Sequence, residues 1–493
     1  MKTAMPSALF RCDASPEVGG GHVTRCLALA EALAETGWRV SFAVGPGTAA
    51  MMPAIAAGGF SIHELACTAE DEPALLRGCH PDGIALLVVD HYQRDIQFEE
   101  ACRGFARQIL VMDDATGRRH DCDILVDAAA NDRSVYAGDG PAPARLLLGP
   151  HYALVRRAFT ARRAEALQRR DGRPVENILV SFGATDPWNA TPVALDALGR
   201  FADDISIIVA LSSRAPHLDE VRRKLRGRMQ LVLDADMAEL MTAADLAIGA
   251  AGASSYERAV LGLPSIVVTL ADNQRGIARA VIDAGAAIDA GRFDPTFSSR
   301  LAAIMRTLIP DPGARIRMTE AATALVDGRG WQRLLIGVVG DTAARDGSSV
   351  RLRVAEISDR DWLFELQRVP QTRRYFRNPL APTTEEHACW MARILADPDV
   401  FLLVIEVDGE QAGYVRLDRR KGEKAKFEIS VAVCPKAHGR GVGSVALSLA
   451  RRLQPGAVFD AEILPENIAS RALFTRAGFH QVSENRYQQQ SSC

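Results

Sequence analysis

The sequence has few features of a secreted, disulfide-rich or membrane-spanning protein. Its nine cysteines are scattered through 493 residues and include no C-x-x-C pair. This pattern argues against a disulfide framework or structural zinc and favours a reducing compartment. Lys2 is not followed by the apolar segment of a signal peptide, and no apolar run reaches membrane-spanning length. We therefore expect a cytoplasmic protein without membrane insertion.

The sequence also lacks excess charge and metal-ligand clusters. The formal net charge is only −3, which offers no electrostatic basis for binding nucleic acid or an anionic membrane. No group of His, Cys, Asp and Glu has ligand spacing, so we expect no metal. An apolar fraction of 48% over 493 residues indicates a globular chain of about three domains.

The most informative stretch lies near the N-terminus. Ser7–Cys12 predicts a buried strand, residues 19–21 are all glycine, and apolar residues then recur at helical spacing until Gly37. His22 falls in the first turn of this helix, where the positive end of the dipole disfavours an imidazolium. We expect a neutral histidine that can accept a proton. The alternative is a glycine-rich turn with a capping or packed histidine.

Residues 1–160 alternate strand-like runs with helical segments. Three runs lack polar alternation and end in carboxylates: Ile84–Asp90, Gln108–Asp114 and Asp123–Asp127. Such runs predict a parallel sheet covered on both faces, where ligands collect at the carboxyl ends of strands. Asp13, Asp90 and Asp113 lie at such ends, although each one singly fits a strand-end or helix-capping role better than catalysis.

Residues 161–340 repeat this pattern as a second α/β domain, reached through an Arg-rich helix over 156–173 that we expect to be exposed. Further strands are predicted at Asn177–Phe182, Ile205–Leu211, Gln230–Leu233, Asp245–Gly249 and Pro264–Thr269. After the fourth of these, Gly252 makes a turn and Ser254 and Ser255 open a helix, offering donors to an anion. Ser254 and Glu257 also have the spacing of a capping box, a structural alternative.

Residues 341–349 are small and polar and predict a linker. The domain at 350–493 begins with a strand over Val350–Ile357, and Asp408-Gly409 predicts a hairpin turn. A strand at Phe427–Val433 leads into a glycine-rich turn, whose exposed N–H groups at a helix start suit a pyrophosphate. Alone, this turn could equally be a flexible loop.

Several blocks, in order, resemble the UDP-sugar hydrolase of pseudaminic acid biosynthesis, which has the GT-B fold of the glycosyltransferase that makes lipid II. They are Gly21-His-Val-Thr-Arg25, Val89-Asp-His-Tyr92, Asp113-Asp114, Leu148-Gly-Pro-His-Tyr152, Ser181-Phe-Gly183, Asp186-Pro187 and Ala250–Glu257 through Asn273-Gln274. The resemblance covers residues 5–330. It implies hydrolysis of UDP-2,4-diacetamido-2,4,6-trideoxy-β-L-altropyranose to the free sugar and UDP.

The resemblance also implies roles for individual residues. His22 matches the general base for water, and Tyr92 and Asn273 match other catalytic-pocket residues. The turn from Gly252 would take the diphosphate, and Glu257 the ribose hydroxyls. The full set of implied substrate contacts is Gly20, Gly21, Arg25, Gly183, Gly252, Ser254, Ser255, Glu257 and Gln274. A positioned base and a diphosphate site could suffice without metal, because UDP is a good leaving group.

The C-terminal region resembles the GNAT N-acetyltransferases, through the glycine turn, Glu462–Phe474 and Ala477-Gly-Phe479. The resemblance implies acetyl-CoA as cosubstrate and Glu428 as candidate base, an exposed strand carboxylate being the alternative. The implied cofactor contacts are Val431, Val433, His438, Gly439, Arg440, Gly441, Gly443, Ser444, Asn467 and Ser470. His438 replaces the usual Arg or Gln, and Phe474 replaces the tyrosine that serves many GNATs as general acid.

The expected architecture is α/β, a two-domain GT-B-like hydrolase followed by an α+β GNAT domain. The first hypothesis is a bifunctional enzyme that N-acetylates a 4-amino UDP-sugar and hydrolyses the product. A second is a GT-B glycosyltransferase with a UDP-sugar donor. A third is that the GNAT domain is a regulatory CoA-binding module or acts on another amine. The substrates are small molecules in each case.

Overall fold

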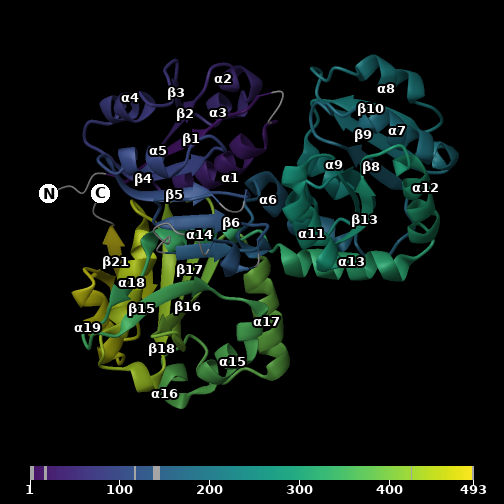
Figure 1. Ribbon diagram of the computed structural model, residues 1–493. Helices are drawn as coiled ribbons and strands as arrows, with labels where there is room; N and C mark the ends of the chain where they lie inside the picture. Colours follow the sequence, from purple (N-terminus) through teal and green to yellow (C-terminus); the bar gives the residue numbers. More distant parts are fainter. Residues whose placement is uncertain are drawn as a thin grey trace. The chain divides into compact units, whose positions relative to one another are not determined.

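The computed structural model describes residues 5–15, 19–115, 118–130, 132–136, 145–423 and 425–490 (Figure 1). Lys2, which entered the sequence analysis, lies outside these residues. The chain divides into two compact units. One comprises Leu9–Glu31 and Ser41–Trp331, and the other comprises Gln332 onward with two short N-terminal segments.

The first sheet has seven strands in the order β3-β2-β1-β4-β5-β6-β7. The strands are β1 Ser7–Cys12, β2 Arg39–Val44, β3 Ser61–Glu64, β4 Ile84–Asp90, β5 Ala106–Met112, β6 Ile124–Asp127 and β7 Arg145–Leu148. The helices are α1 Gly21–Glu35, α2 Thr48–Met51, α3 Ala54–Ala57, α4 Glu72–Cys79 and α5 Ile96–Cys102, with 3₁₀ turns at Arg133–Tyr136 and Pro150–Tyr152. The β2–β3, β4–β5, β5–β6 and β6–β7 pairs are parallel.

The second sheet has six parallel strands in the order β10-β9-β8-β11-β12-β13. They are β8 Asn177–Ser181, β9 Ser206–Leu211, β10 Met229–Leu233, β11 Leu246–Ala250, β12 Ser265–Thr269 and β13 Ala287–Arg292. The helices are α6 Arg157–Gln168, α7 Ala190–Leu198, α8 Leu218–Lys224, α9 Met237–Ala243, α10 Ser254–Val260, α11 Arg275–Asp283, α12 Phe297–Leu308 and α13 Pro312–Leu325, with 3₁₀ turns at Gly199–Phe201 and Asp272–Gln274. The next helix, α14 Gly330–Val339, belongs mostly to the other compact unit.

Each face of this second sheet carries its own core, as expected for apolar runs without polar alternation. Ile248 and Ile266 lie in a cluster with residues of α7 and α12. The alternate positions Ala247 and Val267 lie in a second cluster with residues of α6, α9, α10 and α11. Successive side chains on one strand therefore enter opposite cores.

The third sheet has eight strands in the order β14-β15-β16-β17-β18-β19-β21-β20. They are β14 Thr342–Ala343, β15 Ser349–Val354, β16 Val400–Val407, β17 Glu410–Arg419, β18 Lys426–Val433, β19 Val458–Glu462, β20 His480–Ser483 and β21 Arg486–Gln490. The helices are α15 Arg360–Arg368, α16 Pro370–Arg373, α17 Thr384–Ala396, α18 Val442–Arg452 and α19 Ile468–Arg476, with 3₁₀ turns at Ile357–Asp359 and Pro435–Ala437. The pairs are antiparallel except β18–β19.

Most predicted elements are confirmed, and β1 and β4 have the predicted bounds. The Asp408-Gly409 hairpin is also confirmed. The two residues have φ values of 51° and 88°, and a type I′ turn has positive φ at both central residues. The strands not predicted were β3, β7, β13, β14, β19, β20 and β21, because their short or partly polar sequences lack a continuous apolar run.

Three predictions need correction. The helix over 156–173 is not simply exposed, because Phe159 and Ala166 of α6 are fully buried. An arginine-rich sequence suggests an exposed helix. In the structure, however, Arg163 donates to the Val326 carbonyl at the end of α13. The predicted linker contains β14, which pairs with β15. The strand predicted over Val350–Ile357 ends at Val354, and Ile357 opens a 3₁₀ turn with 63% of its surface exposed. The domain boundaries at 160 and 340–350 remain predictions.

Candidate active sites

The order of strands in both parallel sheets reverses at one place, between β1 and β4 and between β8 and β11. In open α/β sheets the carboxyl ends of the strands at such a point form the usual ligand site. The first point brings together the start of α1 and the end of β4, which carry His22 and Asp90. The second brings together Gly183 and Gly252, which follow β8 and β11.

A buried ion pair joins α1 to the end of β4. Asp90 is completely buried. Arg25 donates two hydrogen bonds to it, from Nε to Oδ2 at 2.5 Å and from Nη2 to Oδ1 at 2.6 Å. Burial alone would raise the pKa of Asp90, but the charge and hydrogen bonds of Arg25 hold this pKa below its usual range. Asp90 is therefore a carboxylate in the folded protein.

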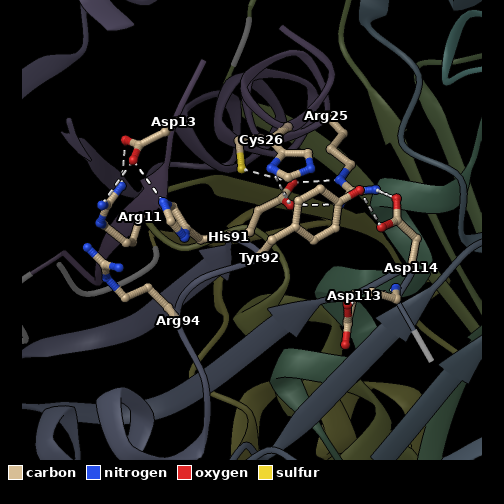
Figure 2. Close-up of polar contacts among 12 residues, drawn as sticks. Arg11, Asp13, Arg25, Cys26, His91, Tyr92, Arg94, Asp113 and Asp114 are labelled. Atoms are coloured by element: carbon tan, nitrogen blue, oxygen red, sulfur yellow. Dashed lines mark hydrogen bonds and ion pairs between the residues drawn. The ribbon is translucent and has the colours of Figure 1, made fainter. Parts of the chain in front are cut away.

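The same arginine extends the network through Asp114 to Tyr92 (Figure 2), and Tyr92 in turn contacts Asn273. Arg25 Nη1 donates to Asp114 Oδ2 at 2.8 Å, and the Tyr92 hydroxyl donates to Asp114 Oδ1 at 2.9 Å. Burial and the Asp114 charge raise the pKa of Tyr92 to about 12, so its hydroxyl stays protonated. Asn273 Nδ2 lies 3.4 Å from the Tyr92 oxygen. The three residues expected to form the hydrolase pocket are thus in one place.

His22 lies against this network. Its ring is 7% exposed and meets the Tyr92 ring edge-on, with centroids 4.5 Å apart. Its Nδ1 is 3.6 Å from Asp90 Oδ1. A carboxylate that faces Nδ1 favours the tautomer protonated there, which leaves Nε2 to accept a proton. This geometry suits a general base.

A second cluster lies beside the first at the same sheet edge (Figure 2). Asp13 accepts bonds from Arg11 and from the backbone N–H of Gly45. His91 Nδ1 accepts from the Gln93 N–H, so its Nε2 donates to Asp13 Oδ2 at 2.8 Å. Burial lowers the pKa of His91, which agrees with a neutral ring. These contacts support a structural role for Asp13.

A histidine bridges two buried carboxylates, one of which, Asp113, precedes Asp114 in the chain. His120 Nδ1 lies 2.6 Å from Glu99 Oε1, and its Nε2 lies 2.9 Å from Asp113 Oδ2. Burial would lower the pKa of His120, but the bonds to Asp113 and Glu99 outweigh it and raise the pKa to about 9. The protonated ring therefore fixes Asp113, the neighbour of Asp114.

The second sheet places the predicted anion-binding turn after β11. The capping box between Ser254 and Glu257 is not formed, since no side chain caps α10. Both serine hydroxyls instead accept bonds from Arg258. Glu257 accepts from Arg156 Nε at 3.2 Å, and burial raises the pKa of this carboxyl.

The remaining predicted substrate residues have different surroundings. Gln274 uses its Oε1 to accept from the Leu270 N–H at 2.9 Å. Gly183 has a φ of 102°, and a Cβ there or at Gly21 would meet nothing within 4 Å, whereas one at Gly20 would meet Met52. The turns at Gly21 and Gly183 are therefore open to a ligand.

In the third sheet, β18 pairs with β19 only over Lys426 to Glu428. From Ile429 to Val433 no other strand of the described residues pairs with β18 on that side, so the predicted edge at Val431 and Val433 is present. The His438 ring donates to the Val433 carbonyl at 2.9 Å. An extended ligand arm can pair with such an edge.

The glycine turn follows at the start of α18. Gly439 and Gly441 have φ values of 78° and 92°, which only glycine adopts readily. Gly443 and Ser444 lie in the first turn of α18, and the Ser444 N–H already donates to the Gly441 carbonyl at 3.0 Å. Arg440 Nε binds Asp346 Oδ2 at 2.5 Å, so its side chain is held by a carboxylate of the predicted linker.

The other predicted acetyltransferase residues have protein partners. Arg377 bridges Glu428 and Glu462. Asn467 caps α19 by accepting from the Ser470 N–H at 3.1 Å. Phe474 is 3% exposed and packs edge-on against Phe479. Phe474 is thus a core residue.

Neither a metal-binding group of three or more His, Cys, Asp or Glu nor a helix with the length and hydropathy of a membrane span occurs among the residues that the structure describes.

Two families match separate parts of the chain. The glycosyltransferase family 28 C-terminal domain matches residues 206–326, over the second sheet. The acetyltransferase (GNAT) domain matches residues 349–480, over the third. The chain joins a GT-B-like part to a GNAT acetyltransferase domain.

Relatives agree with this two-part organisation. The chain is homologous to the UDP-2,4-diacetamido-2,4,6-trideoxy-β-L-altropyranose hydrolase of Campylobacter jejuni, at 28% identity over 55% of this chain and 94% of that one. The spore coat polysaccharide biosynthesis protein SpsG of Bacillus subtilis is 32% identical over 38% of this chain, and the match spans only 57% of SpsG. An uncharacterized protein of Methanocaldococcus jannaschii is 23% identical over 96% of both chains.

Solved structures resemble each part separately. MurG of Acinetobacter baumannii covers 67% of this chain and 98% of its own, with 15% identity and a TM-score of 0.48. Spermidine N-acetyltransferase of Vibrio cholerae, solved with CoA and spermine, covers 29% of this chain and 96% of its own, with 16% identity and a TM-score of 0.27.

Sequence reasoning missed three charged groups around the predicted pockets. Asp90 and Asp114 appeared only as strand-end carboxylates, and Arg258 was not singled out. A carboxylate two residues before the predicted pocket residue Tyr92 was the available signal for Asp90. No signal marked Arg258, because an arginine inside a predicted helix is ordinarily exposed.

The His120 contacts predict a pH-dependent contribution to stability. Because the folded-state pKa of about 9 exceeds the unfolded value near 6.5, this contribution is complete below about pH 6.5 and is lost as pH rises through about 9. We expect the thermal midpoint of His120→Gln to fall furthest below wild type at pH 6. The gap should narrow by pH 9.5, and a gap independent of pH would contradict the assignment.

Proposed function

We propose that the GT-B-like part hydrolyses a UDP-sugar of the diacetamido-trideoxyhexose class, releasing UDP and the free sugar. The carrying observation is that His22, Tyr92 and Asn273 meet at the strand-order reversal of the first sheet, with Asp90 behind His22. Homology to the Campylobacter hydrolase supports this substrate class.

In the proposed reaction, His22 Nε2 takes a proton from water as the water oxygen attacks the anomeric carbon. The bond between that carbon and the UDP oxygen breaks, and UDP leaves with the bonding electrons. Asp90 stabilises the imidazolium that forms, and the Tyr92 hydroxyl and Asn273 amide offer hydrogen bonds to the sugar. The turn from Gly252 to Ser255 would hold the diphosphate and Glu257 the ribose.

We further propose that the GNAT domain transfers an acetyl group from acetyl-CoA to the 4-amino group of the precursor UDP-sugar. The two reactions would then be consecutive on one chain. The fit of the cofactor rests on the open β18 edge and on the glycine turn, both of which the structure contains. Arg377 already binds the candidate base Glu428, so this base would act only after that contact opens.

The match to glycosyltransferase family 28 favours one alternative, sugar transfer to an acceptor other than water. Incubating the protein with the diacetamido UDP-sugar in H₂¹⁸O separates the two. Hydrolysis at the anomeric carbon places ¹⁸O in the free sugar and none in UDP. A glycosyltransferase would release little UDP until an acceptor is added.

The first prediction concerns the base. His22→Asn should lower kcat for UDP release by at least about 10²-fold, because water loses its proton acceptor. Acetyl transfer by the same variant, measured from CoA release, should be unchanged and serves as an internal control. Near wild-type UDP release would show that His22 is structural.

The second prediction concerns the carboxylate behind the base. Asp90→Asn should lower kcat about 10- to 100-fold with little change in KM, because the tautomer of His22 is no longer fixed. Asp127→Asn is the matched control. Asp127 is also a buried strand-end aspartate of this sheet, but it bonds to Tyr136 and backbone N–H groups. Equal kcat values in the two folded variants would refute the role of Asp90.

The third prediction concerns the glycine turn. Gly439→Val should abolish acetyl-CoA binding in calorimetry, because a side chain would fill the open space over the turn. Gly422→Val is matched, since Gly422 has a φ of 81° against 78° and neither Cβ would meet an atom within 4 Å. The control should bind acetyl-CoA despite similar backbone strain. Binding by both variants would remove the turn from the cofactor site.

A further inference from the structure

Arg258 is a buried cation without an ion-pair partner in the described chain. It lies on α10 with 2% of its surface exposed, and burial lowers its pKa to about 10. Its Nε has no hydrogen-bond partner. The adjacent carboxylate, Glu257, binds Arg156 instead. A buried charge without compensation is costly, so such a group calls for an explanation.

The guanidinium lies directly behind the turn that follows β11. Its Nη2 donates to Ser255 Oγ and to the Ala250 carbonyl, both at 2.9 Å, and its Nη1 donates to Ser254 Oγ at 3.3 Å. A Cβ on Gly249 would lie 2.9 Å from Nη1 and 2.4 Å from the Ser181 carbonyl. The missing side chain of Gly249 thus lets the guanidinium approach the carboxyl ends of the paired strands β8 and β11, where the strand order reverses.

These contacts also set the direction of the hydroxyl protons. Each serine oxygen accepts from Arg258, so its own proton must point elsewhere. The Ser255 hydroxyl has the Ala250 carbonyl at 3.5 Å. Ser254 is partly exposed, and its proton remains available to an acceptor at the surface of the turn. A positive charge behind an outward hydroxyl creates a site for an anion.

We propose that Arg258 is a positioning residue for the diphosphate of the UDP-sugar, acting through Ser254 and Ser255 and supplying the positive charge of that site. The inference rests on the proposed function and deepens it. With only seven residues, α10 contributes a weak dipole, so the arginine is the main local charge. The bound diphosphate would in turn compensate the buried cation.

The test compares binding of UDP and uridine by calorimetry to the full chain. Arg258→Met should weaken UDP binding at least tenfold while changing uridine binding less than twofold, because only UDP carries the diphosphate. Arg258→Lys keeps the positive charge but loses the paired guanidinium donors to the two serines, so its affinity for UDP should be intermediate. It also provides the measurement if the methionine variant does not fold.

Arg170→Met is the matched control. Arg170 is also buried, its pKa is likewise lowered to about 10 by burial, and it donates to the Ala244 and Met241 carbonyls away from the turn. This variant should lose thermal stability but bind UDP as wild type does. A folded Arg258 variant with wild-type UDP affinity would overturn the inference and leave the proposed hydrolase intact. Failure of wild type to bind UDP would overturn both.

Discussion

The buried pair between Arg25 and Asp90 determines the geometry of the hydrolase-like site. It ties the first turns of α1 to the end of β4, and it places His22 three residues from the guanidinium. Removing one partner of such a pair leaves the other charge buried, at a cost of about 3–5 kcal/mol. The pair also carries the network onward through Asp114 to Tyr92. The position of the base and of the tyrosine therefore depends on the same contact.

Much of this arrangement follows from the sequence, but only up to the point where strand order matters. The apolar run of β4 and the glycines before α1 predict a strand end and a helix start, which put His22 and Tyr92 near ligands. They do not show that Arg25 reaches Asp90, 65 residues away. That contact requires β1 and β4 to be neighbours, which no local pattern encodes.

The predictions that failed did so because composition concealed packing. The Arg-rich α6 looks exposed, yet its Arg163 guanidinium binds carbonyls at the ends of α10 and α13 while Phe159 enters the core. Long arginine stems can cover apolar surface and still satisfy buried backbone groups. The same property hides Arg258, since the sequence around Glu257 does not reveal which face of α10 is buried.

In the acetyltransferase domain, two side chains expected to touch the cofactor already have protein partners. His438 binds the Val433 carbonyl and Arg440 binds Asp346. The glycine backbone is the part of the turn that remains available. Cofactor binding would thus depend more on backbone N–H groups than on these two side chains, which tolerate replacement more easily.

The two-residue strand β14 covers part of one edge of the acetyltransferase sheet. β15 would otherwise be an edge strand with unpaired backbone groups, and such edges recruit strands from other molecules. Thr342 and Ala343 cover the first two residues of β15, pairing with Val350 and Ser349. A fragment that begins at Ser349 would lose this cover and gain a route to aggregation. The segment predicted to be a linker therefore also protects part of a sheet edge from pairing with another molecule.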